Sequence, residues 1–276
     1  MTHMTKGVYE AKKKNGQLYY RAHIHFRGKH IALGSFDTME HAGKVHEAAR
    51  ELLDDSKITL PDAFSKYPLI RYDKIVTLLN FRNNGIYLGT PIYLLSGYFI
   101  YYLSPELELK FDNDDLFYYS SHRILQRGGH LYINDYGMQV NLLSRYGIKN
   151  YAIAGVDYLF ANGDETDFRY ENIVNINPYY GVSRLDQHGR IFYQVKIHIN
   201  GNYQIGIYED EAIAAIAYNK AVDLAKAAGI DRNYPTNYVT SMSAKEYAEC
   251  YTKIHVSRSY REYLHTLFQD GVDTHS

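Results

Sequence analysis

The sequence contains few of the features that mark secreted, metal-binding or membrane proteins. Its one cysteine, Cys250, excludes an internal disulfide and a cysteine-based zinc cluster, as is typical of a protein kept in a reducing compartment. No run of 18 or more apolar residues is present, because glycine, proline and serine interrupt the most apolar stretch, 86–103. The first residues also lack the apolar region of a signal peptide. We therefore expect no membrane partner and a cytoplasmic location.

Tryptophan is absent, whereas tyrosine is abundant, with 30 copies in 276 residues. Because tyrosine suits both buried cores and wet interfaces, this bias indicates no function. The charge distribution is more informative. The net charge is −1, yet the first thirty residues hold seven basic residues and one acid, whereas 106–115 holds five acids and one lysine. This separation predicts a basic surface on one part of the protein, as contacts to phosphate groups require.

The chain contains an internal repeat at an offset of roughly 173 residues. Residues 7–36 read GVYEAKKKNGQLYYRAHIHFRGKHIALGSF, and residues 181–208 read GVSRLDQHGRIFYQVKIHINGNYQIGIY. Each copy starts with Gly-Val and carries glycine turns between alternating apolar and polar residues, which predicts a three-stranded antiparallel meander. A helix should follow each meander, from a cap at residue 37 or 38 to about 54, and from a cap at 209 or 210 to about 228.

Alternation along the second strand of each copy predicts one apolar and one polar face. The apolar set should pack on the helix and leave a polar set open to solvent. That polar set comprises Arg21, His23 and His25 in the first copy and Gln194, Lys196 and His198 in the second. An ordinary solvated face would explain one copy, but the same donor-rich pattern in both favours DNA. A ribbon of this width enters a major groove, where arginine and lysine favour guanine and glutamine favours adenine.

Both copies resemble the Apetala-two (ethylene-response-factor or integrase type) DNA-binding domain over 6–55 and 179–240. The resemblance rests on the opening GV, on LGSF or IGIY, on the helix EAIAAIAYNKAVDLA and on NYP at 233–235. It implies that each sheet contacts bases and phosphates in a major groove. The implied contact residues are Tyr9, Lys12, Arg21, His23, His25 and His30, with Lys13 and Lys14 beside them, and Arg184, Gln194, Lys196, His198 and Tyr203. The family usually has tryptophan where Ala32 stands, so its known target sequences are not expected to transfer.

Between the repeats, 111–177 resembles the HNH homing-endonuclease family, most closely at ANGDETDFRYENI (161–173). Such a site needs a histidine base and metal ligands. The position of the base falls on Phe160, or on Tyr158 if a gap keeps Asp157. Ser144 stands where the family has a second histidine, and Phe168 stands where it has its central asparagine. Of the possible metal ligands, only Asn172 remains. We therefore predict no catalytic residues, no metal and no cofactor. The remaining candidates, His122 and His130, have no acidic partner at ligand spacing and are expected to be packing or surface residues.

The predicted fold class is α+β, with two modules, each a three-stranded antiparallel sheet plus a helix, flanking a central mixed α+β domain, and with a C-terminal helix. The predicted boundaries are 1–55 for the first module, 56–70 for a linker, 71–178 for the degenerate HNH-like domain, 179–240 for the second module and 241–276 for a helical tail. Strands are expected within 71–109. Ser243 should cap a single helix to about residue 268. An apolar stripe on that helix, formed by Tyr247, Tyr251 and Ile254, would pack on the second repeat or form a homodimer face.

These observations predict a sequence-specific double-stranded DNA-binding protein that is not an enzyme. It would be a bacterial or phage transcription regulator, or an accessory factor of a mobile element, associated with the nucleoid. One alternative is an active HNH endonuclease, which would nick plasmid DNA with Mg²⁺ or Mn²⁺. Another is a protein-binding adaptor, whose affinity would depend little on salt.

Overall fold

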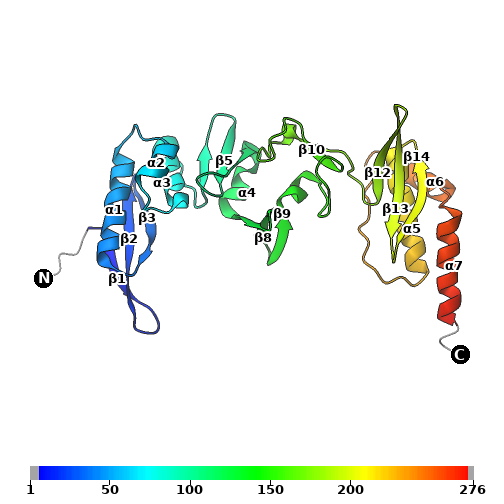
Figure 1. The fold of residues 1–276 in the computed structure, drawn as a ribbon, viewed down its shortest axis with the longest axis horizontal. Helices are drawn as coiled ribbons and strands as arrows, with labels where there is room; N and C mark the ends of the chain where they lie inside the picture. The colour runs from blue at the N-terminus through cyan, green and yellow to red at the C-terminus, as the bar shows by residue number, and fades with distance from the viewer. Residues whose placement is uncertain (1–5, 273–276) are drawn as a thin grey trace. The chain divides into compact units, whose positions relative to one another are not determined.

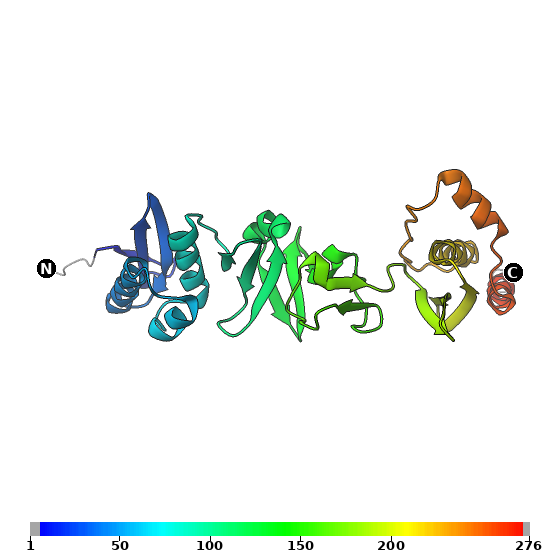
Figure 2. The ribbon, with the colours of Figure 1, turned by 90° about the horizontal axis from the view of Figure 1, so that it is seen from above.

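A computed structural model describes residues 6–272, and for 268–272 it describes the backbone alone. Over this range the fold is α+β, with seven α-helices and five small antiparallel sheets (Figures 1 and 2). Residues 1–5 and 273–276, which belong to the predicted first module and helical tail, lie outside the described range. No helix within it is long and apolar enough to span a membrane. The chain divides into two compact units. The first unit holds the residues up to Leu142 together with the later segment Asn162–Asn172. The second unit holds Leu143–Ala161 and the residues from Ile173 onward.

The first predicted module is present as a three-stranded antiparallel sheet covered by one helix. Its elements are β1 (Val8–Lys12), β2 (Leu18–Phe26), β3 (Lys29–Phe36) and α1 (Met39–Asp54). The predicted cap is confirmed, because the side chain of Thr38 accepts a hydrogen bond from the backbone N–H of His41. Alternate apolar residues of β2, such as Ala22 and Ile24, are buried against α1. Packing of this apolar set is what fixes the helix on one face of the sheet.

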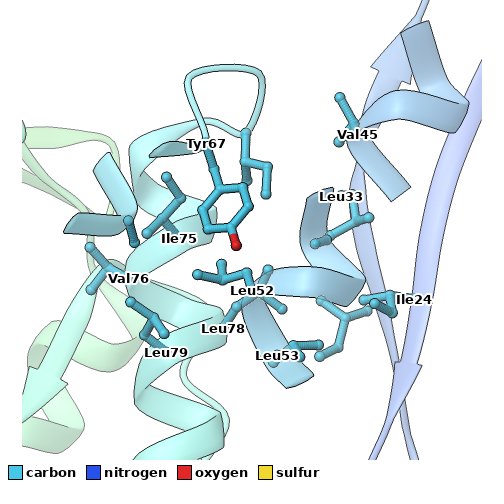
Figure 3. Packing of buried hydrophobic residues seen from close by; sticks show 14 of the residues in the cluster. Ile24, Leu33, Val45, Leu52, Leu53, Tyr67, Ile75, Val76, Leu78 and Leu79 are labelled. Atoms are coloured by element: carbon cyan, nitrogen blue, oxygen red, sulfur yellow. The ribbon is translucent and has the colours of Figure 1, made fainter. Parts of the chain in front are cut away.

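The expectation of a linker over 56–70 is wrong, because this segment folds into helix α2 (Leu60–Lys66) and joins the core. Thr59 caps the helix, and Pro61 lies in its first turn, where a backbone N–H has no intrahelical partner to lose. Ala63, Tyr67 and Ile70 are all buried. Figure 3 shows Tyr67 among side chains contributed by α1 and by the following helix.

Helix α3 (Tyr72–Asn84) occupies a part of the chain where strands were expected. Its residues Ile75, Val76, Leu78 and Leu79 belong to the same buried cluster as Leu52 and Leu53 of α1 (Figure 3). The buried guanidinium of Arg82 joins the helices, because it donates hydrogen bonds to the carbonyl oxygens of Leu52, Asp55 and Ile58 at and beyond the end of α1. The first module therefore does not end at residue 55, since it shares one core with α2 and α3.

The residues between the repeats do not form the single domain predicted for 71–178. Two three-stranded sheets belong to the first unit, and one two-stranded sheet belongs to the second. The first unit holds β4 (Ile92–Leu94), β5 (Tyr98–Tyr102), β6 (Glu108–Asp112), α4 (Leu116–Ser121), β7 (Ile124–Arg127), β8 (His130–Asp135) and β9 (Met138–Asn141). The second holds β10 (Tyr158–Phe160) paired with β11 (Ile173–Asn175). Short 3-10 turns lie at Asn113–Asp115, Leu142–Tyr146 and Tyr170–Asn172.

The second predicted module is also present. Its elements are β12 (Val182–Gln187), β13 (Arg190–His198), β14 (Asn202–Tyr208) and α5 (Glu211–Ala227). Asp210 caps α5 through a 2.8 Å hydrogen bond from the backbone N–H of Ile213. Small residues of α5, including Ala214, Ala217 and Ala221, are fully buried against the sheet. Their size lets the helix lie close to the strands.

The C-terminal segment forms two helices rather than one: α6 (Ala244–Lys253), which Ser243 caps as predicted, and α7 (Arg258–Val272). The helix is interrupted because Ser257 donates its backbone N–H to the carbonyl of Ile205 and its hydroxyl to the carbonyl of Gln204, which holds this segment along β14. Tyr260 is fully buried and donates its hydroxyl to the carbonyl of Ala221. The apolar sides of the helices therefore pack within the second module.

The two modules share one irregularity in the same place. In the first, the pairing of β2 with β3 shifts between Ala22 and His23, so that Leu33 has no partner of its own. In the second, the pairing of β13 with β14 shifts between Val195 and Lys196 and leaves out Ile205 in the same way. This β-bulge turns the third strand so that its outward residues no longer follow simple alternation.

Each module starts with a glycine, and the same physical reason requires it in both. Gly7 and Gly181 have positive φ, at +83° and +68°. A Cβ atom on Gly7 would lie 2.3 Å from the ring of His46 in α1, and one on Gly181 would lie 2.1 Å from the ring of Tyr218 in α5. Both positions therefore require glycine for backbone conformation and for space. The repeat seen in the sequence is thus also a repeat of structure, down to this glycine and the bulge.

Candidate nucleic-acid interface

Each module has one sheet face that its helix does not cover. The registers and the bulges determine which residues point outward there. The first open face consists of Tyr9, Ala11, Tyr19, Arg21, His23, His25, His30, Ala32 and Ser35. The second open face consists of Ser183, Leu185, Gln187, Arg190, Phe192, Gln194, Lys196, His198, Asn202, Gln204 and Ile207, with Gln187 and Arg190 at its edge beside the β12–β13 turn. All of these side chains are exposed or partly exposed.

Arg21 is the central cation of the first open face. Its Nη2 donates a 2.5 Å hydrogen bond to the hydroxyl of Tyr19, and its guanidinium lies 5.3 Å from the centre of the Tyr19 ring. Across the strand pair it faces Tyr9, and on the other side it faces Ser35. Tyrosine thus orients Arg21 through a hydrogen bond rather than through an ion pair with a carboxylate.

Three histidines continue the same face toward the β2–β3 turn. The rings of His23 and His30 stack at 4.5 Å, and Tyr9 meets His23 edge-on at 5.7 Å. His25 is paired directly with His30. The Nδ1 atom of His23 is buried and has no hydrogen-bond partner among the described residues. Burial, followed by repulsion from His30 and from Arg21, lowers the pKa of His23 below its ordinary value.

The second open face presents amides where the first presents a guanidinium. Gln194 donates its side-chain N–H to the Oε1 of Gln204 at 3.0 Å. Nearer the β13–β14 turn, the His198 ring bonds to the Asn202 amide oxygen at 2.9 Å. Lys196 lies between these two pairs and is exposed.

Carboxylates are missing from both open faces, although the strands themselves contain acids and all strand residues are described. Glu10 and Asp186 pair with Tyr20 and Ile191, so alternation places them on the helix side. Arg21 and Lys196 are therefore free of acidic neighbours on their own faces. A surface of this kind attracts phosphate groups.

Three of the predicted contact residues lie elsewhere. Lys12 pairs with Leu18, and Arg184 pairs with Tyr193, so both have the alternation of the helix side. Tyr203 stacks on Tyr263 of α7 at 4.2 Å and belongs to the packing of the second module. Lys13 and Lys14 lie in the β1–β2 turn, at the rim of the first open face.

Several residues of the open faces were missed from the sequence: Tyr19, Ser183, Phe192, Asn202 and Gln204. Strand alternation alone identifies the first three, because Tyr19 lies two residues before Arg21 and Phe192 two before Gln194. The outward residues beyond the bulge, Ser35 and Ile207, need the register of the third strand, which the sequence does not show.

The nuclease-like segment uses its polar residues to hold its own backbone. Asn172 is buried, accepts the backbone N–H of Asn162 at 2.7 Å and donates to the carbonyl of Asp167 at 2.8 Å. Asp157 accepts hydrogen bonds from the backbone of Ile153 and the amide of Asn177. These polar groups therefore already form hydrogen bonds within the segment itself.

The other HNH-like positions are occupied in the same manner. The guanidinium of Arg169 binds Asp167 at 2.6 Å and lowers the pKa of that carboxyl. Phe168 is buried and stacks on Phe111 at 5.5 Å, and Ser144 donates to the amide oxygen of Asn150. An ion pair and apolar packing thus occupy the positions that the sequence resemblance aligns with the family's site.

His122 differs from its prediction, because it does have an acidic neighbour. Its Nε2 lies 3.6 Å from Asp135, while its Nδ1 is within 2.9 Å of the Tyr118 carbonyl and its ring stacks on Tyr118 at 4.3 Å. Within the described range, no group of three histidine, cysteine, aspartate or glutamate side chains is arranged to hold a metal ion. No protein-family model, curated protein or solved structure matches this chain.

Proposed function

We propose that the protein binds double-stranded DNA sequence-specifically with the open faces of its two modules and does not cut it. The observation that carries this proposal is the repetition of a donor-rich, carboxylate-free face on two sheets with the same register and the same bulge. A solvated sheet needs no such repetition, whereas a strand ribbon that enters a major groove needs donors and no negative charge. The resemblance to the Apetala-two domain supports the same conclusion.

Each module would contribute base contacts from the centre of its face and phosphate contacts from its rim. In the first module, Arg21 and the histidines supply the base contacts, and Lys13 and Lys14 supply phosphate contacts from the adjacent turn. In the second module Gln194 takes the central place for base contacts, and the neighbouring Lys196 supplies a phosphate contact. Because one chain carries both modules, binding of one raises the effective concentration of the other at a neighbouring site.

The segment between the modules would serve as a scaffold. Its Asp157, Asp167 and Asn172 are bonded internally, and an aromatic ring cannot accept a proton as a base must. A DNA-binding chain of this kind acts by occupying a site, as a bacterial or phage regulator or a mobile-element accessory factor does, and would be found with the nucleoid.

The direct test is binding of the purified chain to duplex DNA at several salt concentrations. If several basic residues neutralise phosphates, affinity should fall at least tenfold when the salt concentration rises from about 50 to 200 mM. Affinity for duplex that does not change with salt would contradict the proposal and favour a protein-binding adaptor.

Single substitutions locate the interface. Arg21→Ala and Lys196→Ala should each weaken binding by about 1–3 kcal/mol while leaving thermal stability almost unchanged, because both side chains are exposed. The matched controls Arg50→Ala on α1 and Lys226→Ala on α5 remove the same charges from exposed positions on the helices and should bind normally. Equal losses for the two test variants support use of both faces, and no loss for either contradicts the assignment.

A further inference from the structure

The registers make the two open faces comparable position by position. In the second strands, Tyr19 corresponds to Phe192 and Arg21 to Gln194, because Ala22 pairs with Val8 just as Val195 pairs with Val182. In the third strands, Ala32 corresponds to Gln204, because each pairs with the residue that directly follows the register shift. The faces have one backbone geometry but different side chains.

In the first module, the pair Tyr19 and Arg21 presents mainly hydrogen-bond donors, because the guanidinium has no acceptor. The guanidinium has five N–H groups, and the Tyr19 hydroxyl accepts from one end of it. The remaining donors form the fork that matches the O6 and N7 acceptors of guanine in the major groove. No acid on this face competes for them, as all its residues are described.

The second module replaces that pair by two amides. Gln194 gives a donor to Gln204, so the pair retains an acceptor oxygen on Gln194 and donor hydrogens on Gln204. One acceptor beside one donor is complementary to the N6 donor and N7 acceptor of adenine. Guanine offers two acceptors at this edge and would leave the Gln194 oxygen without a donor.

The neighbours of the amide pair are apolar. Phe192 is partly exposed beside Gln194, and Ile207 is 43% exposed opposite it. In the first module the corresponding residues are the polar Tyr19 and Ser35. Apolar side chains in a major groove contact the C5 methyl group that distinguishes thymine. The second open face thus combines groups for both members of an A·T pair.

We propose that the two modules read different sequences, the first a segment with guanine through Arg21 and the second a segment of A·T pairs through Gln194 and Gln204. This inference rests on the proposed function. It makes the target a bipartite site with unlike halves rather than a direct or inverted repeat of one motif.

The test is selection of duplexes from a random pool by the full chain. The expected result is two unlike segments, one with a guanine and one of A·T pairs. Two copies of one motif, or guanine in both segments, would overturn the inference while leaving DNA binding intact. Failure to retain any duplex would instead contradict the proposed function itself.

A transplant sharpens the test. The triple variant Phe192→Tyr, Gln194→Arg and Gln204→Ala gives the second face the reading residues of the first. It should shift the A·T segment toward guanine and bind the original target less tightly by a factor on the order of ten. An unchanged selected sequence contradicts the inference.

Two further variants guard against a folding artefact. Gln204→Ala alone, at an exposed position, should relax the adenine preference and leave the guanine segment intact. If both selected segments stay unchanged in this variant, the inference is overturned. Gln139→Ala removes an exposed glutamine from β9, outside both modules, and should select the original sequence. Loss of the same preference in that control would likewise overturn the assignment.

Discussion

Replacement of Gly181 by alanine tests whether the second module is built as the structure shows. The backbone there has φ of +68°, and a Cβ would lie 2.1 Å from the Tyr218 ring and 2.5 Å from the carbonyl oxygen of Lys196. The left-handed conformation costs alanine about 1–2 kcal/mol, and the overlap adds about 1–3 kcal/mol. We therefore expect Gly181→Ala to lower the free energy of unfolding of this module by about 2–5 kcal/mol.

Gly189→Ala is the matched control, because Gly189 has φ of +80° in the same module and no atom lies within 4 Å of the place that the alanine methyl group would take. It should show the conformational cost alone, about 1–2 kcal/mol. Since the chain has two units, unfolding is best followed locally, by hydrogen exchange of the β13 amides in increasing urea.

The overlap itself can be tested by coupling. Combining Gly181→Ala with Tyr218→Ala removes the ring that a methyl group would meet, so the double variant should lose less than the two single losses added together. If Gly181→Ala is no more destabilising than Gly189→Ala, the close approach of α5 to the start of β12 is refuted.

Protonation of His23 adds positive charge to the first open face, so affinity for duplex should rise as the pH falls below about 6.5. The stability of the fold should change in the opposite direction: because folding lowers the pKa of His23, the free energy of unfolding should decline as the pH falls. His23→Ala should make the pH dependence of binding shallower in a titration. With Mg²⁺ or Mn²⁺, supercoiled plasmid should stay intact on a gel, and reproducible nicking would overturn the scaffold role of the middle segment. Arg82→Met should destabilise the first unit by about 3 kcal/mol in urea unfolding, because three carbonyl groups lose a charged donor, whereas Arg50→Met, on the exposed side of α1, should change little.

The elements with a local cause were predictable. Alternation in β2 and β13, the turn residues of the hairpins and the caps Thr38 and Asp210 all act over a few residues, so their pattern is readable without neighbours. The same holds for the polar set of each second strand, since its side chains point away from the apolar set.

Helices α2 and α3 show where such reasoning fails. The linker predicted for 56–70 is wrong because Pro61 is accommodated in the first turn of α2, and because the burial that stabilises α2 comes from α1 and α3. At residues 254–257 a helix was predicted but is interrupted, because Ser257 donates hydrogen bonds to backbone carbonyls of β14. In each case the deciding partner is distant in the chain.

By itself, the sequence determined that this protein contains one module twice, each with an open polar face, because strand period and turn chemistry are local properties. Only the tertiary structure decided which residues share that face. The bulges opposite Ala22 and Val195 shift the third strands by one residue, bring Gln204 beside Gln194 and place Tyr203 against α7. A register depends on pairing between strands, so no single strand encodes it.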